Sequence, residues 1–421
     1  MLDDVVVMVL AGGVGERLYP LTKERAKPAV YFGGPYRIID FTLSNCLNSG
    51  LRKVFIALQY KSLSLTRHVR FGWSVVADEL GEFIDILSPQ KRVGEHWYLG
   101  TADAVYQNLY SILRENPRQL IVLSGDHVYK MDYAKMLHFH REHGAGATLA
   151  VIEVPSEEAD RFGVLQVDAQ GRLTRFLEKP KDLPPGEVVL TSLGIYIFDV
   201  DVLVPALEAD AGLATAHDFG KDIIPDLISK VPVFAYRFYD ENKKAAKYWR
   251  DIGTLDAYYD ANIDLCHVNP DFNLYDPEWP LRTYQVQAPP AKFVFADANR
   301  CGQALDSVIS AGCIISGSRV AGSVLCPNVR VHSFCDIDQS ILMPGVRVGR
   351  HARIRRAIVD RDVFVPRGAL IGYNADEDRR RHTVSESGIV VVTTDDEPYI
   401  GEISEEALQS EAEFDRRGSE K

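Results

Sequence analysis

The chain has 421 residues, 46% hydrophobic and 25% charged, which is a globular composition with enough length for two or three domains. A net charge of −12 and a pI of about 5.4 argue against a surface for nucleic acid or anionic membrane, so any anionic substrate needs a local cluster of cations. The N-terminal apolar run is too short for a signal peptide or membrane span, and the cysteines lack Cys-x-x-Cys spacing, which predicts a reduced, cytosolic protein with free, buried thiols in its C-terminal third.

About the first 265 residues alternate short apolar runs with amphipathic helical patterns. Strands are predicted at residues 5–10, 53–58, 120–123, 147–154 and 194–198, and helices at 103–114 and 133–143. This alternation is typical of a Rossmann-like α/β domain with a mostly parallel sheet. Ligands of such sheets bind at the carboxyl ends of the strands, where the motifs described next are found.

A glycine-rich turn follows the first predicted strand and contains Gly12, Gly13 and Gly15, with Arg17 and Lys27 after it. Glycine lets main-chain N–H groups approach an anion closely, and the two cations supply fixed positive charge, so the segment predicts a polyphosphate site. It has neither the Gly-Lys-Ser/Thr end of a Walker loop nor the Gly-x-Gly-x-x-Gly spacing. The alternative is a tight strand-to-helix turn with solvated cations.

Two aspartates are candidate ligands for Mg²⁺. Asp126 directly follows the strand at 120–123, and Asp251 lies in Trp-Arg-Asp-Ile-Gly-Thr at 249–254. Mg²⁺ usually takes one or two protein carboxylates and completes its shell with phosphate and water. The alternative for a single aspartate after a strand is a helix cap.

Further polar residues stand at predicted turns. Pro180 favours extended backbone at Lys179, which aims a compact cation suited to phosphate, and Glu178 can accept hydrogen bonds from sugar hydroxyls. Tyr98 precedes a second glycine turn and can stack on a base, and Gln59 can bond a base edge. No Ser-His-Asp or Cys-His arrangement is indicated, which fits direct displacement at phosphorus.

Five prolines interrupt residues 268–291, which predicts a connection between domains. Beyond it, apolar residues recur every six positions, a period that suits a parallel β-helix, with an irregular β-sandwich as the alternative. The spacing is seen at Val308, Ile314, Val320 and Cys326, at Ile337 and Met343, and at Val348 and Ile354. We therefore expect a catalytic domain at 1–267, a connection at 268–291, an assembly or regulatory β-helix at 292–401, and a charged tail at 402–421 without assigned function.

Specific motifs follow one another over nearly the whole chain. They are Arg-Ala-Lys-Pro-Ala-Val at 25–30, Gly-Gly-Pro-Tyr-Arg-Ile-Ile-Asp-Phe-Thr-Leu-Ser-Asn at 33–45, Trp-Tyr-Leu-Gly-Thr-Ala-Asp-Ala at 97–104, His-Asp-Phe-Gly-Lys-Asp at 217–222 and the 249–254 segment. In these the chain resembles the ADP-glucose pyrophosphorylase (glucose-1-phosphate adenylyltransferase) family. The resemblance implies a nucleotidyltransferase domain followed by a left-handed β-helix of hexapeptide repeats, assembled as a homotetramer. It also implies the Mg²⁺-dependent reaction of ATP with glucose 1-phosphate, the committed step toward glycogen or starch.

The resemblance also implies roles for individual residues. Asp126 and Asp251 would hold Mg²⁺, Arg17 would contact the leaving phosphates, and Lys27 would lie near the reacting ones. Lys179 would clamp the sugar phosphate. The expected substrate-binding set comprises Gly12, Gly13, Gln59, Tyr98, Gly100, Thr101, Gly163, Glu178, Lys179 and Ser192.

Allosteric control by phosphorylated metabolites is expected from the same resemblance. Arg25 and Arg37 match effector-site arginines of the family, and Arg355 or Arg356 could join them from the β-helix. Glu24 stands where the branch regulated by fructose 1,6-bisphosphate usually has lysine, so a carboxylate would repel that effector. A different effector is therefore expected.

Three other functions remain open from the sequence. The chain could use another base, as a guanylyl- or uridylyltransferase, although residues 33–45 argue against it. The β-helix could be an acyltransferase, although it is short and no histidine is indicated as a base. The chain could be an inactive regulatory subunit, although Arg17, Lys27, Asp126, Lys179 and Asp251 are all present.

Overall fold

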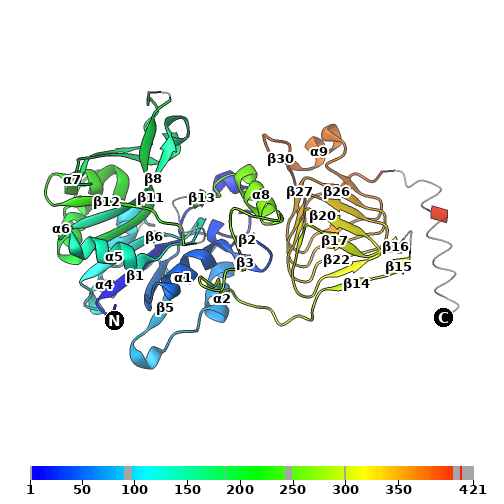
Figure 1. Ribbon diagram of the computed structural model, residues 1–421, viewed down its shortest axis with the longest axis horizontal. Coiled ribbons are helices and arrows are strands. Elements are labelled where there is room, and N and C mark those ends of the chain that lie inside the picture. The colour runs from blue at the N-terminus through cyan, green and yellow to red at the C-terminus, as the bar shows by residue number, and fades with distance from the viewer. Residues whose placement is uncertain are drawn as a thin grey trace.

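The computed structural model describes residues 2–89, 97–184, 186–241, 249–297, 300–401 and 408–409, without the side chain of Asp251. An α/β domain lies on one side and a stack of β-coils on the other, with helix α8 (Leu255–Asp264) between them (Figure 1). None of the helices among the described residues combines the length and apolar character that crossing a membrane would need.

The α/β domain is built on a sheet of nine strands among the described residues. Strands β6 (Gln119–Ser124), β1 (Val5–Leu10), β4 (Lys53–Ala57) and β5 (Phe83–Leu87) run parallel to one another. The long strand β11 (Val188–Asp199) joins β6 antiparallel. The remaining strands are β8 (Ala147–Pro155), β9 (Gly163–Val167), β10 (Leu173–Glu178) and β12 (Val233–Arg237).

Helices cover both faces of this sheet, which explains the continuous apolar run of β1. Val5, Val7 and Val9 face one cluster, and Val6 and Met8 face the other. The first cluster includes α1 (Ile38–Asn48), α2 (Leu63–Gly72) and α5 (Tyr133–Glu142). The second includes α3 (Thr101–Tyr106), α4 (Leu109–Arg114), α6 (Val200–Ala211) and α7 (Ile224–Ile228). The predicted α/β class is confirmed.

Two predicted elements differ from the structure. The single helix expected at 103–114 is two helices, because the Asn108 side chain donates to Ala104 O at 2.8 Å and replaces a main-chain donor there. The strand expected from Gly194 begins at Val188, because Gly194, with φ of 67°, lies in a bulge between Ser192 and Tyr196 rather than at a strand end.

The connection at 268–291 is fully described and forms no helix or strand. It packs closely on the α/β domain: the indole of Trp279 donates to Asn45 Oδ1 at 2.8 Å, and Lys130 Nζ donates to Asn273 O at 2.8 Å. The prolines therefore mark an extended strap along the domain surface.

The C-terminal part of the chain, from Lys292 on, is a parallel β-helix with three sheets. The first holds β14 (Lys292–Val294), β19 (Ile314–Ser316), β22 (Arg330–Val331), β25 (Arg347–Val348) and β28 (Phe364–Val365). The second holds β17 (Gln303–Leu305), β20 (Arg319–Ala321), β23 (Asp336–Asp338), β26 (Arg353–Arg355) and β29 (Leu370–Ile371). The third holds β18 (Val308–Ile309), β21 (Val324–Leu325), β24 (Ile341–Leu342), β27 (Ala357–Val359), β31 (Val390–Val392) and β30 (Thr383–Val384), beside helix α9 (Ala375–Arg381).

The coil length differs from three exact hexapeptides. Pairing of Val308 with Val324, and of Val324 with Ile341, gives steps of 16 and 17 residues. The inward position therefore drifts from the six-residue spacing, so that Ile315 is fully buried where the spacing predicted Ile314. Cys301 also differs from its prediction: it is exposed, whereas the other five cysteines are buried, and all six are free thiols.

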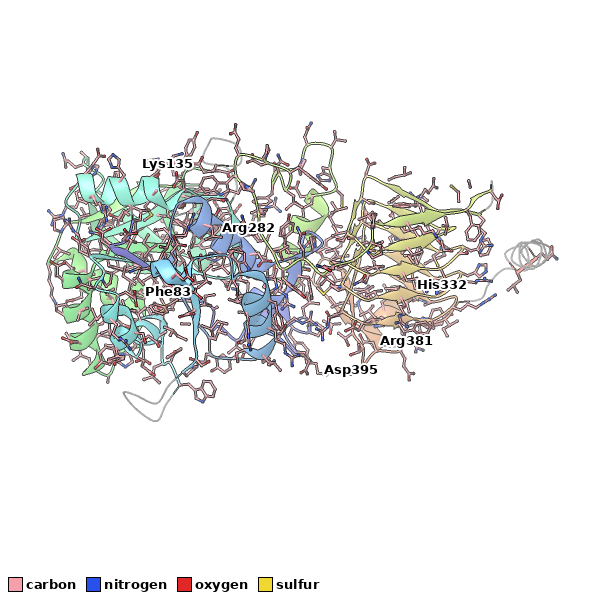
Figure 2. All side chains as sticks on the ribbon, turned by 90° about the horizontal axis from the view of Figure 1, so that it is seen from below. Phe83, Lys135, Arg282, His332, Arg381 and Asp395 are labelled. Atoms are coloured by element: carbon pink, nitrogen blue, oxygen red, sulfur yellow. The ribbon has the colours of Figure 1, made fainter. Side chains whose placement is uncertain are left out.

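The third sheet of the β-helix joins the two halves of the molecule. Leu325 and Leu342 point into the coils, whereas Val324, Ile341 and Ile358 pack with residues of the α/β domain such as Leu21 and Val30. In Figure 2, Asp395 lies at this junction and His332 on the side of the β-helix turned away from it. The junction thus continues the apolar core from one half into the other.

Candidate active site

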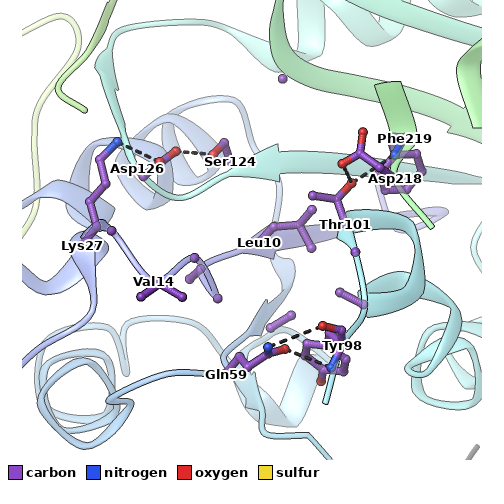
Figure 3. Close-up of a pocket in the computed structure, with 18 of the residues that line it drawn as sticks. Leu10, Val14, Lys27, Gln59, Tyr98, Thr101, Ser124, Asp126, Asp218 and Phe219 are labelled. Carbon is purple, nitrogen blue, oxygen red and sulfur yellow. Dashed lines mark hydrogen bonds and ion pairs between the residues drawn. The ribbon is translucent and has the colours of Figure 1, made fainter. Parts of the chain in front are cut away.

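A cleft of about 860 Å³ opens at the carboxyl ends of the parallel strands (Figure 3). Leu10, Ala57 and Ser124 end strands β1, β4 and β6 at its floor. A neighbouring cavity of about 540 Å³ lies on the side of β9 and β11. The two cavities share the residues Arg17, Ser124, Asp126, His127, Glu178, Lys179, Gly194 and Tyr196.

The glycine turn forms one wall of the larger cavity. A Cβ on Gly12 would lie 3.2 Å from Gln59 Cβ, whereas a Cβ on Gly13 would meet nothing within 4 Å, so main chain is bared to the cleft there. Gly15 has φ of 69°, and a Cβ there would lie 3.1 Å from Lys27 Cβ. Glycine is therefore needed at 15 for both the backbone angle and the packing of Lys27.

Lys27 and Asp126 form an ion pair at the cleft floor, where Lys27 Nζ lies 2.8 Å from Asp126 Oδ2. Ser124 Oγ also donates to Asp126, and His127 Nε2 lies 3.4 Å from its Oδ1. Burial by itself raises the pKa of Asp126, but the charges of Lys27 and His127 and the two hydrogen bonds outweigh it and hold this pKa well below its usual range. Asp126 is therefore an anion that attracts cations.

Asp251 belongs to β13 (Trp249–Asp251), which pairs antiparallel with β7 (His127–Tyr129). The main chain of Asp251 is opposite His127, one residue from Asp126, although its side chain lies outside what the structure describes. No group of three or more histidine, cysteine or acidic side chains gathers as a metal site among the described residues.

The residues at Asp126 nevertheless fit a divalent cation. The Asp126 carboxylate is ionised, and its Oδ2 already binds one cation, the ammonium of Lys27. Mg²⁺ needs only one or two protein carboxylates when phosphate oxygens and water complete its shell.

On the opposite wall the side-chain amide of Gln59 binds the main chain of Tyr98 (Figure 3). Tyr98 N–H donates to Gln59 Oε1 at 3.0 Å, and Gln59 Nε2 donates to Tyr98 O. Asn108 donates to the Tyr98 hydroxyl at 2.9 Å. Gln59 thus holds the loop that carries Tyr98, and its predicted hydrogen bond to a base remains a prediction.

Gly100 and Thr101 begin α3 and contact the segment around Asp218. A Cβ on Gly100 would lie 2.2 Å from His217 O, so only glycine fits there. The Thr101 hydroxyl donates to Asp218 Oδ2 and accepts from Phe219 N–H.

The smaller cavity brings Gly163, Glu178, Lys179 and Ser192 together, and their predicted contacts with substrate stay predictions. A Cβ on Gly163 or on Gly220 would lie within 3.1 Å of Glu178 Oε2, so both glycines make room for this carboxylate. Burial raises the pKa of Glu178, and the Lys179 ammonium, 3.3 Å from Glu178 Oε1, offsets part of that effect.

The backbone predicted for Lys179 is wrong. Lys179 has φ of 48°, in the left-handed region, rather than the extended geometry expected before Pro180. Its N–H donates to Phe162 O at 3.0 Å, and this tertiary hydrogen bond holds the turn against the local preference.

Several lining residues were not singled out from the sequence. His127, Tyr196 and Asp218 line the larger cavity, and Asp160 and Arg161 line the smaller one. Asp218 could have been found, because it lies in the 217–222 motif that carried part of the resemblance. Asp160 and Arg161 lie in an ordinary charged run and carry no comparable signal.

The four predicted regulatory arginines have separate contacts. Arg25 is buried and forms an ion pair with Asp360 of the β-helix, 2.9 Å apart. Arg37 donates to Ser64 Oγ and lies over the Tyr31 ring. Arg355 lies over the Tyr373 ring, and Arg356 donates to Ser387 O.

The fold and the cleft define a nucleotidyltransferase that carries a left-handed β-helix of hexapeptide repeats. Residues 6–267 match the family model described as nucleotidyl transferase, and residues 289–392 match GlmU-like, C-terminal hexapeptide. Among curated relatives, a glucose-1-phosphate adenylyltransferase of Koribacter versatilis is 58% identical over 396 residues, 92% of this chain and 95% of the relative. Enzymes of the same name from Methylococcus capsulatus and Yersinia pseudotuberculosis are 52% and 50% identical, over 93% of this chain and 93% and 94% of their own lengths. This chain therefore belongs to the glucose-1-phosphate adenylyltransferase family, as the motifs predicted.

Proposed function

We propose that this enzyme transfers the adenylyl group of ATP to α-D-glucose 1-phosphate and releases pyrophosphate, a step that supplies ADP-glucose for glycogen or starch. One observation carries the proposal: the two cavities meet at Asp126, which lines both. A displacement between two bound phosphates needs such a shared wall, where the reacting atoms can come to about 3–3.5 Å. The names of the relatives supply the identity of the two substrates.

The larger cavity suits the nucleotide. Main-chain N–H groups of the turn at Gly12 and Gly13 would bind phosphate oxygens, and the loop of Tyr98 and Gly100 would border the adenine. Arg17 and Lys27 would neutralise the phosphates, which matters in a chain with a net charge of −12.

The smaller cavity suits the sugar phosphate. Glu178 would accept hydrogen bonds from glucose hydroxyls, Ser192 would contact the sugar, and Lys179 would bind its phosphate. A phosphate oxygen of glucose 1-phosphate then attacks the α-phosphorus of ATP, the bond from that phosphorus to the bridging oxygen breaks, and pyrophosphate leaves with the electron pair. The protein contributes position and charge and forms no covalent bond to substrate.

We propose Mg²⁺ as the divalent cation, with Asp126 and Asp251 as its protein ligands. When bound, the ion would neutralise charge that develops on the phosphate oxygens of both substrates. Asp126 is held ready for this by Ser124 and Lys27.

Assembly, regulation and compartment follow the family expectation. We propose a homotetramer controlled by phosphorylated metabolites, with a catalytic domain at 1–267, a connection at 268–291, a regulatory β-helix at 292–401 and a tail at 402–421. The six free thiols favour a cytosolic enzyme.

Pyrophosphate release with glucose 1-phosphate and Mg²⁺ tests the proposal. We expect release with ATP to exceed release with GTP or UTP, and Asp126→Asn to lower kcat by about 10²–10³-fold. Asp226→Asn, at a surface carboxylate paired with Lys230, is the matched control and should retain activity. Folded protein without release from any nucleotide would exclude the enzyme and favour a regulatory subunit.

A further inference from the structure

Lys27 lies two residues after Arg25, and Arg25 forms a buried ion pair that joins the α/β domain to the β-helix. Arg25 is 6% exposed, and its Nη2 lies 2.9 Å from Oδ2 of Asp360, whose side chain is 13% exposed. Arg25 Nη1 also contacts Met343 Sδ at 3.7 Å. Met343 directly follows β24 and Asp360 directly follows β27, two strands of the third sheet of the β-helix.

Asp360 is itself firmly placed. It follows β27, and its N–H donates to Val392 O in β31 at 2.8 Å. Its Oδ1 is buried and makes no hydrogen bond with any residue that the structure describes, so the guanidinium of Arg25 is the main compensation for its charge. A buried charge of this kind strongly disfavours any movement that separates the pair.

Hydrogen bonds and packing fix the segment from Gly15 to Lys27, which connects Arg25 to the cleft. The Thr22 hydroxyl donates to Gly15 O at 2.9 Å, and Lys61 Nζ donates to Thr22 O at 2.8 Å. Lys27 packs against Gly15 and begins a single 3₁₀ turn, Lys27–Ala29, in which Val30 N–H donates to Lys27 O. Lys27 therefore has little freedom to move independently of Arg25.

We infer that Asp360 of the β-helix is a positioning residue for adenylyl transfer, acting through Arg25 to hold Lys27 at the phosphates. The inference rests on the proposed function, since Lys27 must act on ATP or glucose 1-phosphate for its position to matter. According to this inference, the β-helix contributes to the chemical step that takes place in the α/β domain of the same chain. A misplacement of about 1 Å in a reacting group can cost about 10²-fold in rate.

Asp360→Asn tests this because it keeps the shape of the side chain and removes its charge. We expect kcat to fall about 10- to 100-fold, while KM for glucose 1-phosphate changes little, because Glu178 and Ser192 do not contact this pair. Asp360→Glu keeps the charge and should recover part of kcat. Asp395→Asn is the matched control, since the Lys23–Asp395 pair joins the same two segments but is exposed, at 46% and 61%, and should leave kcat within about 2-fold.

A double-mutant cycle with Lys27→Gln separates positioning from general stability. If Asp360 acts through Lys27, the double variant is no slower than Lys27→Gln alone, whereas a separate structural role multiplies the two losses. Multiplied losses, or wild-type kcat in Asp360→Asn, would overturn the inference. If Asp360→Asn fails to fold, the same cycle is measured with Asp360→Glu. Failure of the proposed function appears differently, as a wild type without activity or a Lys27→Gln variant with full activity.

Discussion

The Thr101 hydroxyl donates to Asp218 Oδ2 at 2.9 Å and accepts from Phe219 N–H at 3.0 Å. Thr101 lines the larger cavity, and Gly220, which follows Phe219, lies against Glu178, which lines both cavities. These hydrogen bonds therefore connect the start of α3 to the segment that packs against Glu178.

Thr101→Val should lower the catalytic efficiency with both substrates, because valine keeps the volume of threonine and removes the hydroxyl that makes both hydrogen bonds. Loss of a hydrogen bond to a carboxylate costs about 1.5 kcal/mol, so we expect kcat/KM for ATP and for glucose 1-phosphate to fall about 10-fold each. Thr101→Ser retains the hydroxyl and is the control. Steady-state kinetics with each substrate varied in turn measures this, and an equal loss in the serine variant would contradict it.

Gly100→Ala should disturb the same region by packing alone. A Cβ at residue 100 would lie 2.2 Å from His217 O and 2.4 Å from Ala216 O, so the loops must separate. We expect a loss of about 1–3 kcal/mol in the free energy of unfolding and a higher KM for ATP. Gly212→Ala serves for comparison, because the nearest atom there would be 3.8 Å away. If Gly100→Ala had the same free energy of unfolding as the wild type, this close contact would be refuted.

The affinity for glucose 1-phosphate should depend on the ionisation of Glu178. Burial raises the pKa of this carboxyl, so on lowering the pH it gains a proton earlier than an exposed glutamate, and the neutral acid is a weaker hydrogen-bond acceptor than the carboxylate. KM for glucose 1-phosphate should therefore rise as the pH falls. Glu178→Gln should have a higher KM with a weaker pH dependence, and titration of the substrate phosphate contributes equally to both enzymes. Parallel pH profiles would count against the assignment.

The register of the β-helix can be tested with two neighbouring isoleucines. Ile315 is fully buried in the coil, whereas Ile314 is partly exposed. Ile315→Ala should lower the free energy of unfolding by about 2–5 kcal/mol, and Ile314→Ala by clearly less. Chemical denaturation of both variants decides between them. A larger loss of unfolding free energy in Ile314→Ala than in Ile315→Ala would instead support the strict six-residue spacing, with Ile314 inside the coil.

Local sequence was sufficient for the parts of the site that depend on neighbouring residues. The apolar run before Gly12, the small residues of the turn and the acid after β6 each have a conformational preference that acts over a few positions. The rule that ligands bind at the carboxyl ends of parallel strands then brought these turns to one edge of the sheet. Residues that line both cavities were singled out in this way or through the family motifs, and their roles toward substrate stay predictions.

Backbone details that depend on distant partners were not predictable. Lys179 adopts positive φ while Phe162 O accepts its N–H, and the strand pairing of the β-helix from Val308 to Ile341 gives steps of 16 and 17 residues. Neither constraint is visible in a short window of sequence.

By itself, the sequence determined which elements form, which turns carry glycine and which charges the enzyme has, because these depend on local backbone preference and on composition. Only the tertiary structure decided which charges meet. Lys27 and Asp126 are 99 residues apart, and Arg25 and Asp360 are 335 apart. Arg25 and Asp360 are both buried where the β-helix packs on the α/β domain, and a charge without water requires an opposite charge beside it. Lys27 is likewise buried, and its partner Asp126 is partly open to the cleft.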